Sequence, residues 1–282
     1  MIKSNSDNIY SWIETTGNKS PLVATCKQVE PTGDKSPSVG TCLQVEPIKL
    51  SNQKFIIKHY SKSCKSFQTE VKILSMLSHL HIISVINVIQ TGIIFPQEDS
   101  NLSDYLESSS DIPINIKNNY ISQVASGLNH IHKNNILHLD LKLDNIMITN
   151  NLIKIIDFGS AEFMIDNVVY TKEIKCTATH RPPEGFVESL NRNLNKIFVF
   201  DLGFDIWSFG IVMYEILFGV PIYLQGIMPE YTVDLNYEYL MYQCVMSDEF
   251  HNTIAQVLNP DYMQCLNINS NKRLYMNILG ID

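Results

Sequence analysis

The sequence is short of charge, above all of positive charge, and it has no long apolar run. Charged residues make up 18% of the 282 positions, and the formal net charge is −8. Because no basic cluster is present, binding to nucleic acid through its phosphates is not expected. No segment reaches the roughly 20 apolar residues of a membrane span, and the start, MIKSNSDNIY, lacks an apolar signal core. We therefore expect a soluble, intracellular protein of the cytoplasm, or alternatively of the nucleus, with no nucleic-acid and no membrane partner.

Cysteine is sparse as well. The six cysteines form no C-x-x-C pair, so their pattern favours neither a zinc site nor a disulfide framework. Reduced thiols are the simplest interpretation in an intracellular protein. Hydrophobic residues, by contrast, make up 45% of the chain. That share is enough for a buried core and is not typical of a disordered chain.

A sixteen-residue segment occurs twice in tandem near the start of the chain. TGNKSPLVATCKQVEP (16–31) is followed directly by TGDKSPSVGTCLQVEP (32–47), with twelve of the sixteen positions identical. Each copy begins with a polar turn and continues as a short strand-like run. Two copies are too few for a solenoid. The pattern therefore indicates a tandem duplication of one turn and one β-strand.

Strand-like segments and one helix follow the repeat. KFIIKHY (54–60), VINVI (85–89) and GIIF (92–95) are typical of strands, and the last run ends at Pro96. Between them, SFQTEVKILSMLSHL (66–80) predicts an amphipathic helix. The apolar face of this helix consists of Val71, Leu74 and Leu77.

The later part of the chain is helical in pattern. Residues 116–134 carry Ile121, Val124, Leu128 and Ile131 at the three- and four-residue spacing of a helix stripe. FDIWSFGIVMYEILFG (204–219) is apolar nearly all round, which is typical of a buried helix. A strand-rich part thus precedes a helix-rich part, and we predict an α+β arrangement of two lobes.

Three short segments together suggest phosphoryl transfer, namely FIIK ending at Lys58, HLDLKLDN, and DFG preceded by strand-like IKII. That chemistry needs a cation on the α- and β-phosphates, oxygen ligands for Mg²⁺ and an acceptor for the hydroxyl proton. Lys58 has the chemistry for the first task, and Asp157 with Asn145 for the second. Asp140 suits the third.

In order and spacing, these segments resemble the eukaryotic protein kinases of the serine/threonine type, from about Thr32 to the C-terminus. The resemblance implies the two-lobed kinase fold, of the α+β class. Its small N-lobe has an antiparallel β-sheet plus one helix, and its larger C-lobe is mainly helical. The implied domains are an N-terminal extension with the first repeat copy (1–31) and a catalytic domain (32–282), divided into lobes after about residue 97.

The resemblance also assigns roles to single residues, with ATP and Mg²⁺ (alternatively Mn²⁺) as cofactors and proteins as substrates. Catalytic roles fall to Lys58, Glu70, Asp140 and Lys142, and metal-binding roles to Asn145 and Asp157. ATP contacts fall to Lys58 and Gly40, to Phe95 as gatekeeper, and to the hinge Pro96, Gln97 and Glu98, where the Glu98 N–H is the expected adenine donor. Thr177, Glu184, Asp205 and Arg273 match structural positions around the catalytic loop and the substrate-binding segment.

The phosphate-binding loop departs from the family pattern. KSPSVGTC (35–42) stands where the family has G-x-G-x-x-G-x-V, and only Gly40 aligns. Fewer glycines keep the backbone amides farther from the phosphates, so we expect weaker positioning of ATP. The repeat also leaves two registers open for the preceding strand. We favour VATCKQVEP of the first copy over NIYSWIETT, which would make one copy surplus.

Two further departures concern regulation and the ion pair. The catalytic loop reads HLD rather than HRD, and Leu139 cannot bind a phosphate as an arginine would. We therefore predict activity without phosphorylation of the activation segment. The linker between Lys58 and the helix of Glu70 is short. We therefore expect a shortened helix that still allows an ion pair between Lys58 and Glu70.

Other functions compete with this interpretation. A pseudokinase that acts as a binding or scaffold protein is the main alternative, because the glycine loop is degenerate. Retention of every catalytic position named above favours an active enzyme. Small-molecule kinases of the aminoglycoside or choline type lack a counterpart of Lys142, which also favours serine/threonine over tyrosine transfer. Asp144 and the net charge of −8 suggest basic protein substrates, whereas the simpler interpretation of Asp144 is a solvated surface residue.

Overall fold

The computed structural model describes residues 42–50, 53–60, 65–109, 111–190, 197–219, 246–247, 251–252 and 264–267. Gly40, Arg273 and the first repeat copy lie outside these ranges. The predictions made for them, and the domain boundaries after residues 31 and 97, therefore stay predictions.

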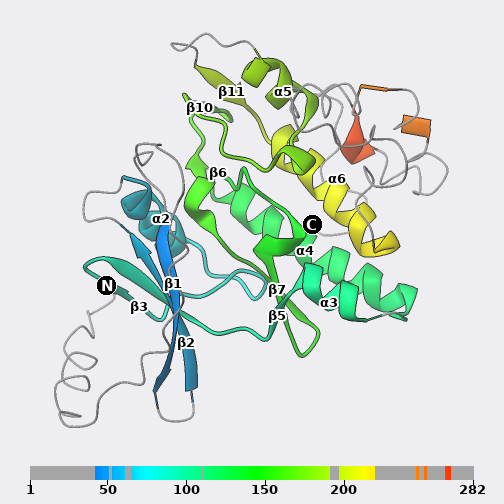
Figure 1. The fold of residues 1–282 in the computed structure, drawn as a ribbon. Helices are drawn as coiled ribbons and strands as arrows, with labels where there is room; N and C mark the ends of the chain where they lie inside the picture. The colour runs from blue at the N-terminus through cyan, green and yellow to red at the C-terminus, as the bar shows by residue number, and fades with distance from the viewer. Residues whose placement is uncertain are drawn as a thin grey trace, which may run out of the picture. The chain divides into compact units, whose positions relative to one another are not determined.

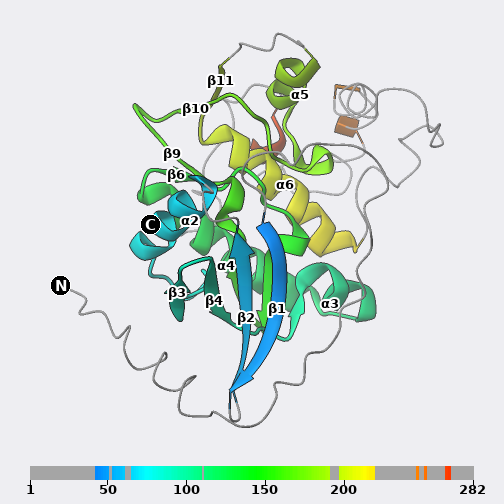
Figure 2. The same ribbon diagram turned by 60° about the vertical axis from the view of Figure 1, so that its left-hand side comes forward.

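A four-stranded antiparallel sheet makes up most of the described N-lobe (Figure 1 and Figure 2). Its spatial order is β1 (Cys42–Leu50), β2 (Gln53–Tyr60), β4 (Gly92–Pro96) and β3 (Asn87–Ile89). β1 contains CLQVEP of the second repeat copy and pairs with β2, which carries Lys58. The second copy therefore supplies a strand, as the sequence predicts.

The helix α2 (Lys65–Met76) is the helix predicted for residues 66–80. Leu74 is buried, Val71 is half-buried, and Leu77 is buried just beyond the last turn. The helix is shorter than the periodicity suggests. The backbone N–H of His81 donates to Nδ1 of His79 at 3.2 Å. This local hydrogen bond offers the chain an alternative to a further helical turn.

The described C-lobe is built on helices. They are α3 (Leu102–Ser108), α4 (Ile114–Lys133), α5 (Pro183–Leu190) and α6 (Gly203–Phe218). The predicted stripe Ile121, Val124, Leu128 and Ile131 of α4 is fully buried, and nearly all of α6 is buried. None of the helices in the described ranges is both long and apolar enough to cross a membrane.

Short strands between the helices form small sheets. One sheet has three strands, in the order β5 (Ser100–Asn101), β7 (Ile146–Thr149) and β8 (Leu152–Ile155). Two further sheets have two strands each, β6 (Ile136–Leu137) with β9 (Glu162–Phe163) and β10 (Val169–Thr171) with β11 (Phe198–Phe200). Two-residue turns at Asn150–Asn151 and Asp166–Asn167 have positive φ at both positions. Asn and Asp tolerate this left-handed geometry, which suits the twist of tight hairpins.

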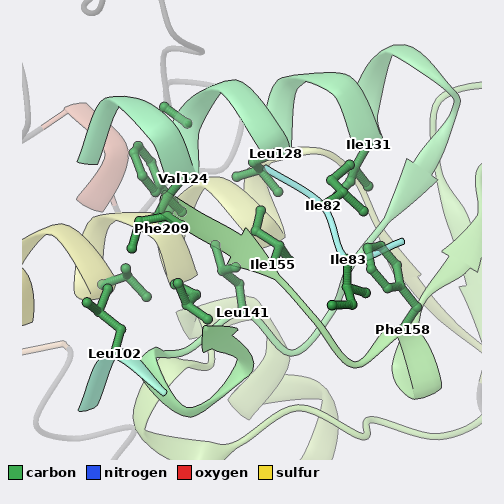
Figure 3. Close-up of a cluster of buried hydrophobic side chains, with 14 of the residues drawn as sticks. Ile82, Ile83, Leu102, Val124, Leu128, Ile131, Leu141, Ile155, Phe158 and Phe209 are labelled. Carbon is green, nitrogen blue, oxygen red and sulfur yellow. The ribbon is translucent and has the colours of Figure 1, made fainter. Parts of the chain in front are cut away.

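One apolar cluster supports both the catalytic loop and β8. Figure 3 shows Val124, Leu128 and Ile131 projecting from α4 toward Ile155 of β8, with Leu141 below. The segment 81–83 adds backbone hydrogen bonds, since Ile83 N donates to Ile155 O and Ile155 N donates to His81 O, both at 3.0 Å. A core of this kind holds the residues that follow β8 in a fixed place. The predicted α+β, two-lobed architecture is thus confirmed.

Candidate active site

Lys58, Glu70 and Asp157 meet although they come from three different elements. Lys58 Nζ lies 2.9 Å from Glu70 Oε1 and 2.6 Å from Asp157 Oδ1. Tyr60, two residues after Lys58 on β2, donates its hydroxyl to the Oε2 atom of Glu70. Glu70 is 1% exposed. Its carboxylate is therefore fully engaged by groups on β2, and the ion pair expected from the sequence is formed.

Lys58, Glu70 and Asp157 each stabilise the charged form of their neighbours of opposite charge. Burial alone would lower the pKa of Lys58, but the neighbouring charges of Glu70 and Asp157 raise it above its ordinary value. Desolvation alone would raise the pKa of Asp157, but Lys58 outweighs it and the pKa lies below its ordinary value. At neutral pH Lys58 is thus a cation and Asp157 an anion, as phosphate and metal binding require.

Asp157 is held by an unusual backbone conformation. Its φ is +60°, in the left-handed region, and its Oδ1 accepts a hydrogen bond from Gly159 N at 3.2 Å. The next side chain, Phe158, is 1% exposed and packs edge-on against His138 with ring centroids 5.1 Å apart. Non-glycine residues rarely adopt positive φ unless the surroundings enforce it. Burial of Phe158 is that enforcement.

Asp140 is oriented by a hydrogen-bond network in the catalytic loop. Its Oδ1 accepts from both the backbone N and Oγ1 of Thr177, each at 2.8 Å. Lys142 Nζ donates to Thr177 Oγ1 at 2.7 Å and lies 3.4 Å from Asp140 Oδ2. Asn145 Nδ2 donates to Asp140 O at 2.8 Å and to Oδ2 at 3.1 Å. The structure therefore brings together the four residues that the sequence placed here.

Asp205 on α6 anchors the same loop from below. Its Oδ2 accepts from His138 N at 2.7 Å and from His132 Nε2 at 2.8 Å, and its Oδ1 accepts from Leu139 N at 2.8 Å. Burial alone would raise the pKa of this fully buried carboxyl group, but the hydrogen bonds and the charges of the two histidines lower it. These contacts hold Leu139 at a φ of +63°. A buried carboxylate is thus used to fix a strained catalytic loop.

A cavity of about 230 Å³ opens beside Lys58 and Asp157. Its lining consists of Ile56, Lys58, Glu70, Ile83, Phe95, Pro96, Glu98, Met147, Ile156 and Asp157. Among the predicted hinge residues, Gln97 does not line it, and its N–H donates to Lys54 O at 3.1 Å. The mostly apolar wall with polar groups at one end is typical of a small-molecule site.

The sequence singled out Phe95 and Pro96 of this cavity but not the other apolar residues of its wall. Ile56, Ile83, Met147 and Ile156 belong to four separate segments and look like ordinary core residues. A partial signal existed for Ile56, because it precedes Lys58 by two positions and so shares its face of β2. No comparable signal marks the other three.

The oxygen atoms left free in the site suit a hard divalent cation. Asp157 Oδ2 and Asn145 Oδ1 accept no hydrogen bond from any residue that the structure describes. Carboxylate and amide oxygens are the ligands that Mg²⁺ prefers, and Mg²⁺ usually takes few of them from the protein. These two residues therefore fit the metal role that the resemblance implies.

Leu139 packs in an apolar cluster, and it also lines a small pocket together with the charged residues Glu162, Glu173 and Lys175. It is buried with Leu137, Val169, Cys176, Phe200 and Phe204. Arg181, which the sequence did not single out, is 5% exposed and donates to Cys176 O at 3.0 Å. Burial raises the pKa of the Cys176 thiol to about 12. Glu184 is half-buried in the first turn of α5. The activation segment, which runs from Asp157 to Glu184, is thus attached to the catalytic loop by apolar contacts at Leu139 as well as by the hydrogen bonds between Thr177 and Asp140.

The sequence is similar to that of known protein kinases. The protein kinase domain model matches residues 35–279. The chain is 27% identical over 215 residues to the serine/threonine-protein kinase TIO of Arabidopsis thaliana, covering 74% of this chain and 16% of that protein. It is 32% identical over 160 residues to a probable cell division protein kinase of Encephalitozoon cuniculi, covering 55% of this chain and 56% of that protein. The chain thus spans only part of the length of these curated relatives.

Among solved structures, the fold is similar to a chain of the yeast RNA Pol II CTD kinase CTDK-1 complex. The TM-score is 0.65 at 20% identity, covering 88% of this chain and 93% of that chain. At that identity the likeness concerns the fold alone. The family match over most of the sequence, however, extends from the strand before Lys58 to beyond α6. The chain belongs to the protein kinase family.

Proposed function

We propose that the chain is an active protein kinase that transfers the γ-phosphoryl group of ATP to serine or threonine hydroxyls of proteins. The observation that carries this proposal is the assembled set of charges at one cavity. The Lys58–Glu70 pair is formed at 2.9 Å, and Asp157 lies against it. Asp140 is held beside Lys142 by Thr177. A protein that had lost catalysis would have no chemical reason to keep both networks intact.

The cavity would hold the nucleotide between its apolar walls. Adenine would meet Ile56, Met147 and Phe95, and the Glu98 N–H at the rim donates to no described residue. Lys58 would bind the α- and β-phosphates, since Glu70 keeps its ammonium group in place. Mg²⁺, or Mn²⁺, bound by Asp157 and Asn145 would neutralise charge on the phosphates.

The catalytic loop would act on the substrate hydroxyl. Both donors of Thr177 go to Oδ1 of Asp140, which leaves Oδ2 the better placed oxygen to orient that hydroxyl and accept its proton. Lys142, within 3.4 Å of Oδ2, places a positive charge beside the transferring group. Both functions depend on preformed geometry, which the network with Asn145 supplies.

Basic protein substrates are part of this proposal. A second cavity of about 160 Å³ lies beside the catalytic loop. Its lining includes the carboxylates of Glu107, Asp144 and Glu215, which come from α3, the catalytic loop and α6. A lysine or arginine next to the target residue would find favourable electrostatics there. A positional peptide library in which Asp144→Asn fails to change the preference for basic residues would contradict this part.

The main test compares wild type with Asp140→Asn in a transfer assay with γ-labelled ATP, Mg²⁺ and a basic substrate protein. We expect label on serine or threonine, reduced on the order of 10³-fold in the variant. Asp166→Asn is a matched control, because Asp166 is exposed and its turn geometry suits Asn. Nucleotide binding without any transfer would instead establish the pseudokinase alternative, with the degenerate segment 35–42 as its cause.

A further inference from the structure

An ion pair links the hinge to the strand that leads into Asp157. Lys154 Nζ on β8 donates to Glu98 Oε1 at 2.6 Å. The side chains of Lys154 and Glu98 are 21% and 6% exposed. Glu98 also lines the nucleotide cavity. Lys154 stands opposite Met147 in the β7–β8 register, and Met147 lines the same cavity. The pair therefore closes one corner of the proposed nucleotide site.

The carboxylate depends on this one partner. Among the residues that the structure describes, Lys154 is the only donor to the Glu98 side chain. A buried carboxylate without a partner is strongly unfavourable, so loss of Lys154 would drive Glu98 toward solvent. Loss of the Glu98 carboxylate should be less unfavourable than loss of Lys154, because a lysine can extend its stem and keep its charge in water.

The hinge backbone is also fixed on both sides of Glu98. Gln97 N donates to Lys54 O at 3.1 Å, and Asp99 N donates to Thr149 Oγ1 at 2.9 Å. Both N–H groups are thereby occupied, whereas the N–H of Glu98 between them donates to no described residue. The bond from Lys154 to the Glu98 carboxylate is the contact that holds the residue between these two fixed points, so without it the Glu98 peptide, and with it this free N–H, can rotate.

We infer that Lys154 is a positioning residue for nucleotide binding, acting through the carboxylate of Glu98. It keeps the backbone N–H of Glu98 directed into the cavity and links the hinge to β8. The inference rests on the nucleotide site of the proposed function. It concerns affinity for the nucleotide and not the transfer step, because Lys154 touches neither Asp140 nor Asp157 in the structure.

The test measures ADP affinity by calorimetry and the steady-state kinetics with ATP. We expect Lys154→Met to weaken ADP binding about tenfold and to raise KM for ATP similarly, with little change in kcat. The double variant Glu98→Leu/Lys154→Met should bind ADP more tightly than Lys154→Met alone, because no carboxylate is left stranded. Lys154→Arg, which keeps the charge, should restore most of the affinity.

Lys117→Met is the matched control. Lys117 is another partly buried lysine whose side chain has a single described hydrogen bond, to Leu217 O at 2.7 Å, and it does not line the cavity. Its replacement should leave ADP affinity unchanged. If Lys154→Met does not fold, Lys154→Gln replaces it in the same comparison.

Two outcomes would overturn the inference. One is unchanged ADP affinity in folded Lys154→Met. The other is a double variant as weak as the single one, which would indicate a general loss of structure rather than a stranded carboxylate. A wild-type protein that binds ADP with this dependence on Lys154 but transfers no phosphate would refute only the proposed activity. Absence of ADP binding by wild type would refute both.

Discussion

At the scale of single residues, Glu70 shows how a buried charge is kept in one place. Lys58 Nζ reaches both of its oxygens, at 2.9 and 3.1 Å, and Tyr60 adds its hydroxyl. Tyr60 is itself 3% exposed and packs against Phe67 of α2, with ring centroids 5.0 Å apart. The helix is thus fixed to β2 at two points, and the tyrosine is a positioning group for the ion pair.

Replacement of this tyrosine gives the first prediction. Tyr60→Phe removes one donor from a buried carboxylate while keeping the ring, so the free energy of unfolding should fall by about 1–2 kcal/mol. We expect kcat/KM to fall several-fold because Glu70 gains freedom. Tyr170→Phe is the control, since Tyr170 is 57% exposed on β10. Equal effects of the two substitutions, measured by urea unfolding and steady-state kinetics, would contradict the positioning role.

Three histidines form a second local cluster. The His79 ring stacks on His130 of α4 at 5.0 Å and lies 5.4 Å from His81. Desolvation, followed by the charges of His130 and His81, lowers the pKa of His79 below its ordinary value of 6.5. The backbone N–H of His81 donates to Nδ1 of this ring at 3.2 Å, and Ser126 Oγ lies 3.3 Å from Nε2. Folding therefore disfavours protonation of His79.

This lowered pKa predicts a pH-dependent stability. The unfolded chain binds the proton more readily than the folded one, so the free energy of unfolding should decrease as pH falls through about 6.5. His79→Gln should show a smaller decrease, because Gln does not titrate. Urea unfolding of both proteins at about pH 7.5 and 5.5 measures the difference. Parallel pH profiles would show that His79 contributes nothing.

At the scale of elements, the activation segment is attached by apolar packing. Val169 of β10 and Cys176 lie against Leu139, and β10 itself pairs with β11 through Val169 and Phe200. The surface buried in this cluster is mainly apolar, and the buried Arg181 bonds to Cys176 within it, so no modified side chain takes part in this packing. The order of this segment is therefore built into the sequence.

We predict that phosphatase treatment leaves the activity of the purified protein unchanged. Leu139→Arg should lower activity more than tenfold, because a long charged side chain cannot replace Leu139 among the apolar side chains of this cluster. Leu139→Met, similar in volume, should cost less than about 1.5 kcal/mol of stability and keep the activity. A protein that loses its activity with phosphatase would show instead that a phosphate orders the segment.

At the scale of the whole molecule, the sequence predicts elements better than contacts between elements. Periodicity located α2 and α4, a run that is apolar nearly all round located α6, and motif spacing located Lys58 and Asp157, because all these signals are local. Ile83, Met147 and Lys154 carry no such signal. Each becomes part of the site only when segments distant in the chain fold together. The early end of α2 has a different origin, because the hydrogen bond between His81 and His79 is local but periodicity does not reveal it.

The duplicated segment gives a prediction for the whole chain. The second copy forms β1, so deletion of residues 16–31 leaves that strand in place. In the register that we favour, the first copy supplies the strand before it, and its deletion should raise KM for ATP about tenfold, as expected when phosphate contacts lose their support. Replacing residues 16–31 by a second TGDKSPSVGTCLQVEP is the control. An unchanged KM after deletion would show that the first copy is dispensable.

The burial of Leu139 has a consequence for control in the cell. An arginine at this position would bind a phosphate on the activation segment. A second enzyme that adds or removes this phosphate could then switch the activity of this protein on and off. A leucine buried among Val169, Cys176 and Phe200 cannot bind a phosphate in this way. We therefore expect the activity of this protein in the cell to depend on its amount, which its rates of synthesis and breakdown set.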